Sequence, residues 1–140
     1  IGETSFEGQG PMSLEAVARD PVDYPRLVLL ADANGFLTLD WAPLVEWLLQ
    51  NAGIDRAQRA GAVHSALADG LVQVAERLRA RDGIGTVGLT GGVFQNRRLT
   101  EAALAGLSAR GFEVLLPVQL PCNDGGLSYG QVADFAGRNA

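Results

Sequence analysis

One stretch, residues 86–97, constrains the fold more than any other, because it joins an apolar run to a pair of glycines and then to the start of a helix. The apolar Val87 and Leu89 predict a buried strand with both faces covered by helices. Gly91 and Gly92 lack a Cβ, so they can adopt positive φ and let a ligand approach main-chain amides. A helix that begins there directs its unpaired N–H groups at the same place. The stretch therefore predicts a sheet with helices packed on it and a turn that an anion fits.

An ordinary connection between a strand and a helix can have the same residues. The glycine pair matches neither the P-loop nor the dinucleotide-binding fingerprint. The stretch alone leaves both interpretations open, and the rest of the chain has to decide between them.

Composition excludes several classes of function. A chain of 140 residues can bury a core as one domain, and no apolar run reaches the roughly 18 residues that span a bilayer. The net charge is −5 and the arginines are scattered, so we expect neither a membrane nor a nucleic acid as a partner. All 11 basic residues are arginine, which excludes a P-loop lysine and a lysine base. Any phosphate contact must come from the backbone or from arginine.

The chain contains one cysteine, Cys122, and one histidine, His64. A single cysteine excludes an internal disulfide and a multi-cysteine zinc site, and it fits a reducing cytoplasm. No base that would activate Cys122 is evident nearby, so we interpret it as a small buried hydrophobe. His64 lies beside the apolar stripe of a helix, where a lone histidine is more often packed and hydrogen-bonded than a ligand. The chain begins at Ile1 rather than at methionine, which suggests a piece of a longer protein.

Periodicity and turn residues predict an α/β or α+β fold with about four strands and five helices. Helices are expected over residues 11–19, 41–50, 56–81, 97–110 and 127–136, and strands over 27–31, 36–39, 87–89 and 112–117. Asn34 and Gly35 are expected to supply the positive-φ positions of a hairpin turn. Asp40 and Asp55 are N-cap candidates for the second and third helices, and Gly111 ends the fourth.

The longest predicted helix has an apolar stripe at three- and four-residue steps, which we expect to pack on the sheet. Its members are Ala60, Val63, Leu67, Leu71, Val74 and Leu78. A second glycine turn, residues 121–126, precedes the last helix. We expect both glycine turns to face one cleft.

Three motifs, read together, resemble the hydrogenase-maturation carbamoyltransferase family HypF. They are FEGQGPMSLE from residue 6, GGVFQN from residue 91 and NDGGLSYGQ from residue 123, and their order and spacing also match. The resemblance covers the whole chain, but only the C-terminal half of the family's last, Kae1-like domain. It implies an α/β fold, the C-terminal lobe of an actin/Hsp70/sugar-kinase-like (ribonuclease H-like) domain, in which a small sheet packs with about five helices. Residues 1–140 would form this single lobe, with the upstream half and the family's other domains absent.

The resemblance also implies an activity. The family uses carbamoyl phosphate and ATP to form carbamoyl-adenylate, and it transfers the carbamoyl group to the C-terminal cysteine of the partner HypE during [NiFe] hydrogenase maturation. This chain would be part of that enzyme and inactive alone. A tRNA threonylcarbamoyladenosine-type transferase is an alternative. It is disfavoured because the Phe-Gln after Gly-Gly-Val and the Asn-Asp-Gly-Gly turn look more like the hydrogenase family, and the lack of a basic face argues the same way. A further alternative is a nucleotide-binding or partner-docking module without activity.

Carried over onto matching positions, the resemblance assigns a nucleotide site. Gly91 and Gly92 would hold phosphate through their main-chain amides, and Asn96 would hydrogen-bond the nucleoside. Gly10 and Glu15 would grip the ribose. The competing interpretation of Asn96 is an N-cap at the start of the helix over 97–110.

The resemblance further implies that Asp124 completes a divalent metal site, with two histidines from the absent half. The metal would be iron or zinc, with magnesium as a further option beside the nucleotide, and a carboxylate suits such an ion. The competing interpretation of Asp124 is an N-cap of the last helix. Glu7 either orients substrate or is a solvated loop charge, and the sequence does not decide.

Overall fold

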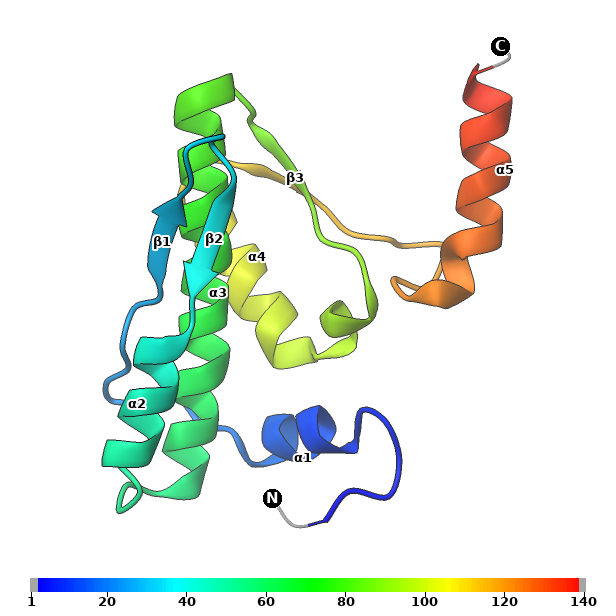
Figure 1. Cartoon of the computed structure of the whole chain (residues 1–140). Helices are drawn as coiled ribbons and strands as arrows, with labels where there is room; N and C mark the ends of the chain where they lie inside the picture. Colours follow the sequence, from blue (N-terminus) through cyan, green and yellow to red (C-terminus); the bar gives the residue numbers. More distant parts are fainter. Residues whose placement is uncertain (1–2, 139–140) are drawn as a thin grey trace.

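A single long helix, α3 (Arg56–Asp82), runs through the fold, and three of the other helices and one strand pack along it (Figure 1). The structure is a computed structural model that describes residues 3–138. α4 (Arg97–Ala109) packs most extensively on α3, while α1 (Gln9–Val17) and α2 (Ala42–Gln50) lie beside its N-terminal half. Together with α5 (Leu127–Arg138), these give the five expected helices within the described residues.

The buried face of α3 consists mostly of small residues, which differs from the expected stripe. Its buried members are Ala60, Gly61, Ala62, His64, Ala66, Ala68, Gly70, Val72 and Ala75. Of the expected stripe only Ala60 is buried, and Leu67 is exposed. The stripe prediction assumed one packed face, whereas α3 contacts α1, α2 and β1 as well as α4. Neighbours on several sides require close approach, and small side chains permit it.

The predicted hairpin is present. β1 (Val28–Ala31) pairs with β2 (Leu37–Asp40) in antiparallel register, with Val28 opposite Asp40. In the turn, Oδ1 of Asp32 accepts hydrogen bonds from the N–H groups of Asn34 and Phe36. Only Gly35 has positive φ, at 81°, so the expectation for Asn34 was wrong. The Asp32 carboxylate organises the turn, which removes the need for a second left-handed residue.

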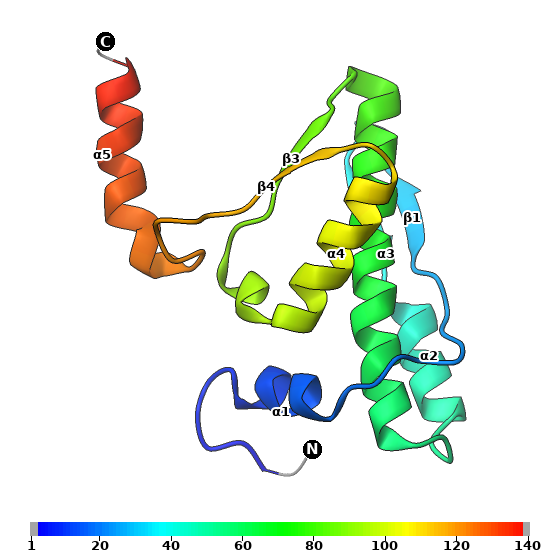
Figure 2. The same cartoon turned by 180° about the vertical axis from the view of Figure 1, so that it is seen from behind.

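A second, parallel pair of strands carries the organising stretch. β3 (Thr86–Gly88) pairs with β4 (Glu113–Leu115), and α4 connects them on one side (Figure 2). Leu89 is buried and Val87 is half-buried against this helical side, whereas Thr86 and Gly88 are exposed. The expectation that both faces are covered was therefore wrong for the described residues. The four expected strands form two separate pairs.

The predicted glycine stop of α4 is confirmed, whereas the two N-cap predictions hold only in part. Gly111 adopts φ of 74° just beyond α4, and Gly83 does the same beyond α3. Oδ1 of Asp40 accepts from the N–H of Ala42 at 2.9 Å, although Trp41 is the residue at the N-cap position. Asp55 lies at the N-cap position of α3, as predicted. Its side chain makes no capping hydrogen bond, so the predicted capping role was wrong.

The last helix, α5, projects from the rest of the chain (Figures 1 and 2). Its main packing is with the short helix η2 (Asp124–Gly126) directly before it. None of its residues is buried, and its apolar Leu127, Tyr129 and Val132 are exposed. Within the described part of the chain, no helix combines the length and the apolar character that a bilayer crossing requires.

Candidate functional site

Two glycine turns meet in one cleft, which confirms the prediction from the sequence. The first follows β3 and the second precedes α5. The N–H of Gly91 donates to the carbonyl oxygen of Cys122 at 2.6 Å, and the hydroxyl of Thr90 donates to the same oxygen at 3.3 Å. The cleft has a volume of about 360 Å³, and residues of both turns line it, including Asp124.

The turn after β3 differs in detail from the expectation. Gly91 alone adopts positive φ, at 105°. Gly92 does not, and it begins a short helix, η1 (Gly92–Gln95), that separates the turn from α4. The N–H of Gly91 is already bonded to Cys122, whereas within residues 3–138 the N–H of Gly92 donates to no acceptor. Gly91 therefore shapes the turn, and Gly92 is the glycine whose amide is available to an anion.

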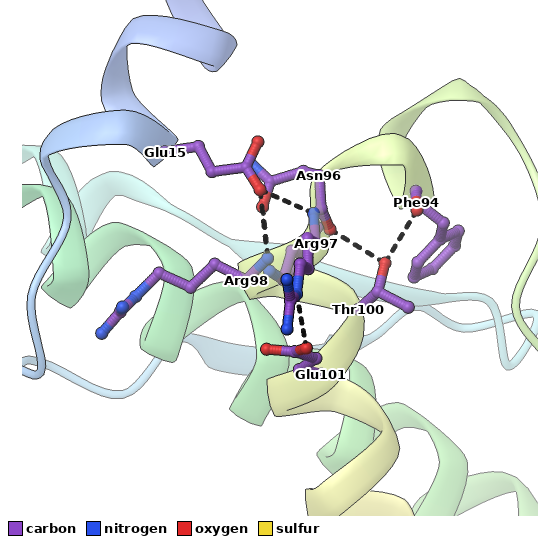
Figure 3. A network of polar contacts seen from close by, with 8 residues as sticks. Glu15, Phe94, Asn96, Arg97, Arg98, Thr100 and Glu101 are labelled. Carbon is purple, nitrogen blue, oxygen red and sulfur yellow. Dashed lines mark hydrogen bonds and ion pairs between the residues drawn. The ribbon is translucent and has the colours of Figure 1, made fainter.

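The start of α4 is closed to ligands (Figure 3). Oε1 of Glu15 accepts from the N–H of Arg97 at 2.7 Å and from that of Arg98 at 3.3 Å. Oδ1 of Asn96 accepts from the N–H of Leu99 at 2.9 Å. These bonds satisfy the amides that a helix leaves unpaired at its first turn. The expectation that this helix start would receive an anion was wrong, because protein oxygens already occupy it.

The side-chain nitrogen of Asn96 also has a hydrogen-bonding partner. Nε2 of His64 lies 2.9 Å from Nδ2 of Asn96, and Nδ1 of His64 lies 2.7 Å from the carbonyl oxygen of Ala60. His64 is only 4% exposed, which confirms it as a packed, hydrogen-bonded residue. The capping role of Asn96 is present in the structure. Its contact with a nucleoside stays a prediction, for which the second N–H of Nδ2 would be the donor.

The two arginines that follow Asn96 are engaged in ion pairs. Nε of Arg97 lies 2.7 Å from Oε1 of Glu101, and this carboxylate raises the pKa of Arg97 (Figure 3). Arg98 pairs with Asp20. Each carboxylate partly neutralises the guanidinium beside it, which weakens the attraction of either arginine for a phosphate. Main-chain contact is therefore the simpler way for this turn to bind an anion.

α1 carries Gly10 and Glu15, the two residues expected at the ribose. Glu15 lies at the start of α4 and uses Oε1 there, while its Oε2 makes no hydrogen bond with residues 3–138. Gly10 is half-buried in the first turn of α1, and Glu7 is exposed just before that helix. Ribose binding stays a prediction. No local pattern in the sequence indicates the bond from Glu15 to α4, because 82 residues separate the partners.

The second turn separates the two interpretations of Asp124. Oδ1 of Asn123 accepts from the N–H of Gly125 at 3.0 Å, so Asn123 is the cap of η2. Asp124 is exposed, and its carboxylate makes no hydrogen bond with the described residues. It is chemically suited to a metal, but no group of three His, Cys, Asp or Glu side chains gathers around one point within residues 3–138. The ligand role stays a prediction. The side chain of Cys122 is half-buried rather than buried.

Comparison with known proteins gives consistent matches across the chain. Residues 1–131 match a family described as "Carbamoyltransferase, Kae1-like Domain, second subdomain". The carbamoyltransferase HypF of Rhizobium leguminosarum bv. viciae is 37% identical over 128 residues, covering 91% of this chain and 16% of that protein. A carbamoyltransferase HypF homolog of Cupriavidus necator is 39% identical over 134 residues, covering 89% of this chain and 34% of the homolog.

Solved structures agree in fold. The crystal structure of full-length HypF in the phosphate- and nucleotide-bound form has a TM-score of 0.83 and 31% identity, covering 94% of this chain and 17% of that one. T. kodakarensis HypF has a TM-score of 0.75 and 26% identity. The chain thus spans only a small part of these relatives, 16% in the Rhizobium protein. It belongs to the carbamoyltransferase HypF family, in which it corresponds to the second subdomain of the Kae1-like domain.

Proposed function

We propose that this chain supplies one wall of the active site of a carbamoyltransferase in [NiFe] hydrogenase maturation. The complete enzyme would use carbamoyl phosphate and ATP to form carbamoyl-adenylate, and would transfer the carbamoyl group to the C-terminal cysteine of a HypE-like protein. Family membership supports the reaction class. The observation that carries the proposal is the cleft in which the Gly91 turn and Asp124 face each other.

The Gly91 turn, with Gly92 next to it just outside the cleft lining, and Asp124 have distinct chemical roles in this proposal. The main-chain amide of Gly92 binds phosphate oxygen, and it does so without reorganisation because Gly91 and the bond to Cys122 fix the turn. Asp124 would contribute one oxygen ligand to iron or zinc, and the metal would polarise a bound oxygen. Its remaining ligands would come from outside this chain. This wall therefore acts by positioning and electrostatics.

Two variants of one glycine test the phosphate role. Gly92→Pro deletes the N–H, and proline suits the first position of a helix. Gly92→Ala keeps the N–H, and its Cβ would meet no atom within 4 Å. With the missing half of the domain supplied, ATP affinity measured by calorimetry should fall about tenfold or more in the proline variant, the effect of one lost charge-assisted hydrogen bond. It should fall clearly less in the alanine variant. Equal affinities in a folded pair would remove the phosphate role from this amide.

The isolated chain should not turn over carbamoyl phosphate, because it carries one wall of the site. A nucleotide-binding or partner-docking module without activity remains the second candidate function, favoured by the exposed apolar residues of α5. Adding the other half of the domain distinguishes the two. ATP-dependent consumption of carbamoyl phosphate would appear only in the mixture for an enzyme, and in neither sample for a docking module.

A further inference from the structure

The two hydrogen-bonding neighbours of His64 determine which nitrogen of its ring carries the proton. Nδ1 lies 2.7 Å from the carbonyl oxygen of Ala60, which can only accept a hydrogen bond. Nδ1 must therefore carry the proton of the neutral ring. Nε2 then has a free lone pair, and the group that it contacts in Asn96 has to be the donor. His64 is buried, so water does not compete for either nitrogen.

This tautomer of His64 sets the orientation of the side-chain amide of Asn96. The NH₂ group faces His64, and Oδ1 is left to face the N–H of Leu99 at 2.9 Å. A flipped amide would place two donors together at Leu99, and it would place an oxygen against the lone pair of His64. Both hydrogen bonds would be lost. One orientation of a side chain thus satisfies α3 and the start of α4 at the same time.

We propose that His64 is a positioning residue for the nucleotide site, an inference that rests on the proposed function. By fixing the Asn96 amide, His64 fixes the residue that joins η1 to α4. The N–H of Asn96 donates to the carbonyl of Val93 at 3.1 Å. The hydroxyl of Thr100 lies 2.9 Å from the carbonyl oxygens of both Phe94 and Asn96, between which its single proton is shared (Figure 3). The orientation of Asn96 is therefore transmitted to the turn that carries the Gly92 amide.

Nitrogen NMR of the imidazole tests the first step. The chain contains a single histidine, so the two ring nitrogen signals have only one assignment. In the folded protein with a neutral imidazole ring, Nδ1 should be protonated and Nε2 unprotonated. Nε2 should show coupling across the hydrogen bond to the side chain of Asn96. A ring protonated on Nε2 would overturn the inference, because Asn96 would then have to present its oxygen to His64.

Variants test the second step. His64→Leu removes the acceptor and leaves the Asn96 NH₂ group unpaired. Amide hydrogen exchange at Leu99 should accelerate by about tenfold, the factor expected for one hydrogen bond. In the double variant with Asn96→Asp, either carboxylate oxygen can accept from Leu99, so the slow exchange should return. A purely space-filling role for His64 predicts no such rescue, and its absence in a folded double variant would overturn the inference.

Nucleotide affinity separates this inference from the proposed function. With the other half of the domain supplied, His64→Leu should bind AMP about tenfold more weakly than the unmodified chain. Unchanged AMP affinity together with accelerated exchange at Leu99 would overturn the positioning role and leave the proposed function intact. Absence of AMP binding to the unmodified chain would instead remove the nucleotide site from the proposed function. The tautomer and the Leu99 rescue would then still decide whether His64 fixes Asn96.

Discussion

Gly61 allows the segment that follows α1 to pass close to α3, and replacing it with alanine is the most direct perturbation of this contact. A Cβ at this position would lie 1.6 Å from the carbonyl oxygen of Arg19 and 3.3 Å from Cδ of Pro21. The obstacle is main chain, so a rotamer change cannot relieve it. The segment after α1 has to move away from α3, which strains the bond from the N–H of Arg19 to the carbonyl of Ala57 at 2.9 Å.

The expected size of the effect follows from three contributions. Overpacking costs typically about 1–3 kcal/mol, and the lost main-chain hydrogen bond costs about 1 kcal/mol more. Alanine regains about 1 kcal/mol because it is the better helix former. Gly61→Ala should therefore lower the free energy of unfolding by about 2 kcal/mol.

Denaturant unfolding followed by tryptophan fluorescence measures this change, since Trp47 lies in α2 and Trp41 lies directly before it. The matched control is Gly130→Ala, another glycine inside a helix, whose added Cβ would meet no atom within 4 Å. This control should leave the unfolding free energy unchanged or raise it by up to about 1 kcal/mol. A Gly61→Ala protein as stable as the control would refute the close approach of the segment after α1 to α3.

Further predictions concern Tyr24 and the turn before α5. Tyr24→Phe should cost about 1 kcal/mol in denaturant unfolding, because it removes the bond from the phenol to Oδ2 of Asp69 at 2.9 Å. Burial, with Asp69 beside it, raises the pKa of Tyr24. Its contribution should therefore be complete below pH about 10 and be lost as the pH rises through the higher folded value, which phenolate absorbance can follow. Asn123→Ala should cost about 1 kcal/mol through the lost cap, whereas Asp124→Asn should change stability by less than about 0.5 kcal/mol and lower metal content and carbamoyl transfer in the complete enzyme.

Each of these results has a clear contrary outcome. If the free energy of unfolding of the Tyr24→Phe protein depended on pH as that of the unmodified protein does, ionisation of the phenol would not be the cause of the pH dependence. Destabilisation by Asp124→Asn but not by Asn123→Ala would reverse the assignment of the cap. Metal content and transfer that survive Asp124→Asn would remove the ligand role.

Local signals in the sequence were sufficient for the order of the five α-helices and four strands, but not for the short helices η1 and η2. Gly111 and Gly35 mark places where the backbone needs positive φ, and both do so in the structure. The apolar stripe of α3 was predicted wrongly because a helical period cannot tell how many neighbours surround a helix. When several do, the positions that must be small are set by the distance between backbones, as at Gly61.

The candidate site was predictable only in part. The two glycine turns carry recognisable residues, and their meeting in one cleft followed from the topology of strands and helices. The contact of Glu15 with the start of α4, and that of His64 with Asn96, join residues far apart in the sequence. No local pattern distinguishes such side chains from solvated ones. The same contacts change the interpretation of the helix start from an anion site to a closed cap.

The bond between Gly91 and Cys122 has a consequence for how freely the cleft can change in sequence. It joins two main-chain groups, so the acceptor is present whichever side chain residue 122 carries. Oxidation or replacement of the thiol can alter the lining of the cleft while the two turns keep their separation. The donor side has no such freedom, because φ of 105° at Gly91 strains any residue with a Cβ. Residue 122 can therefore be replaced without loss of this hydrogen bond, whereas position 91 favours glycine.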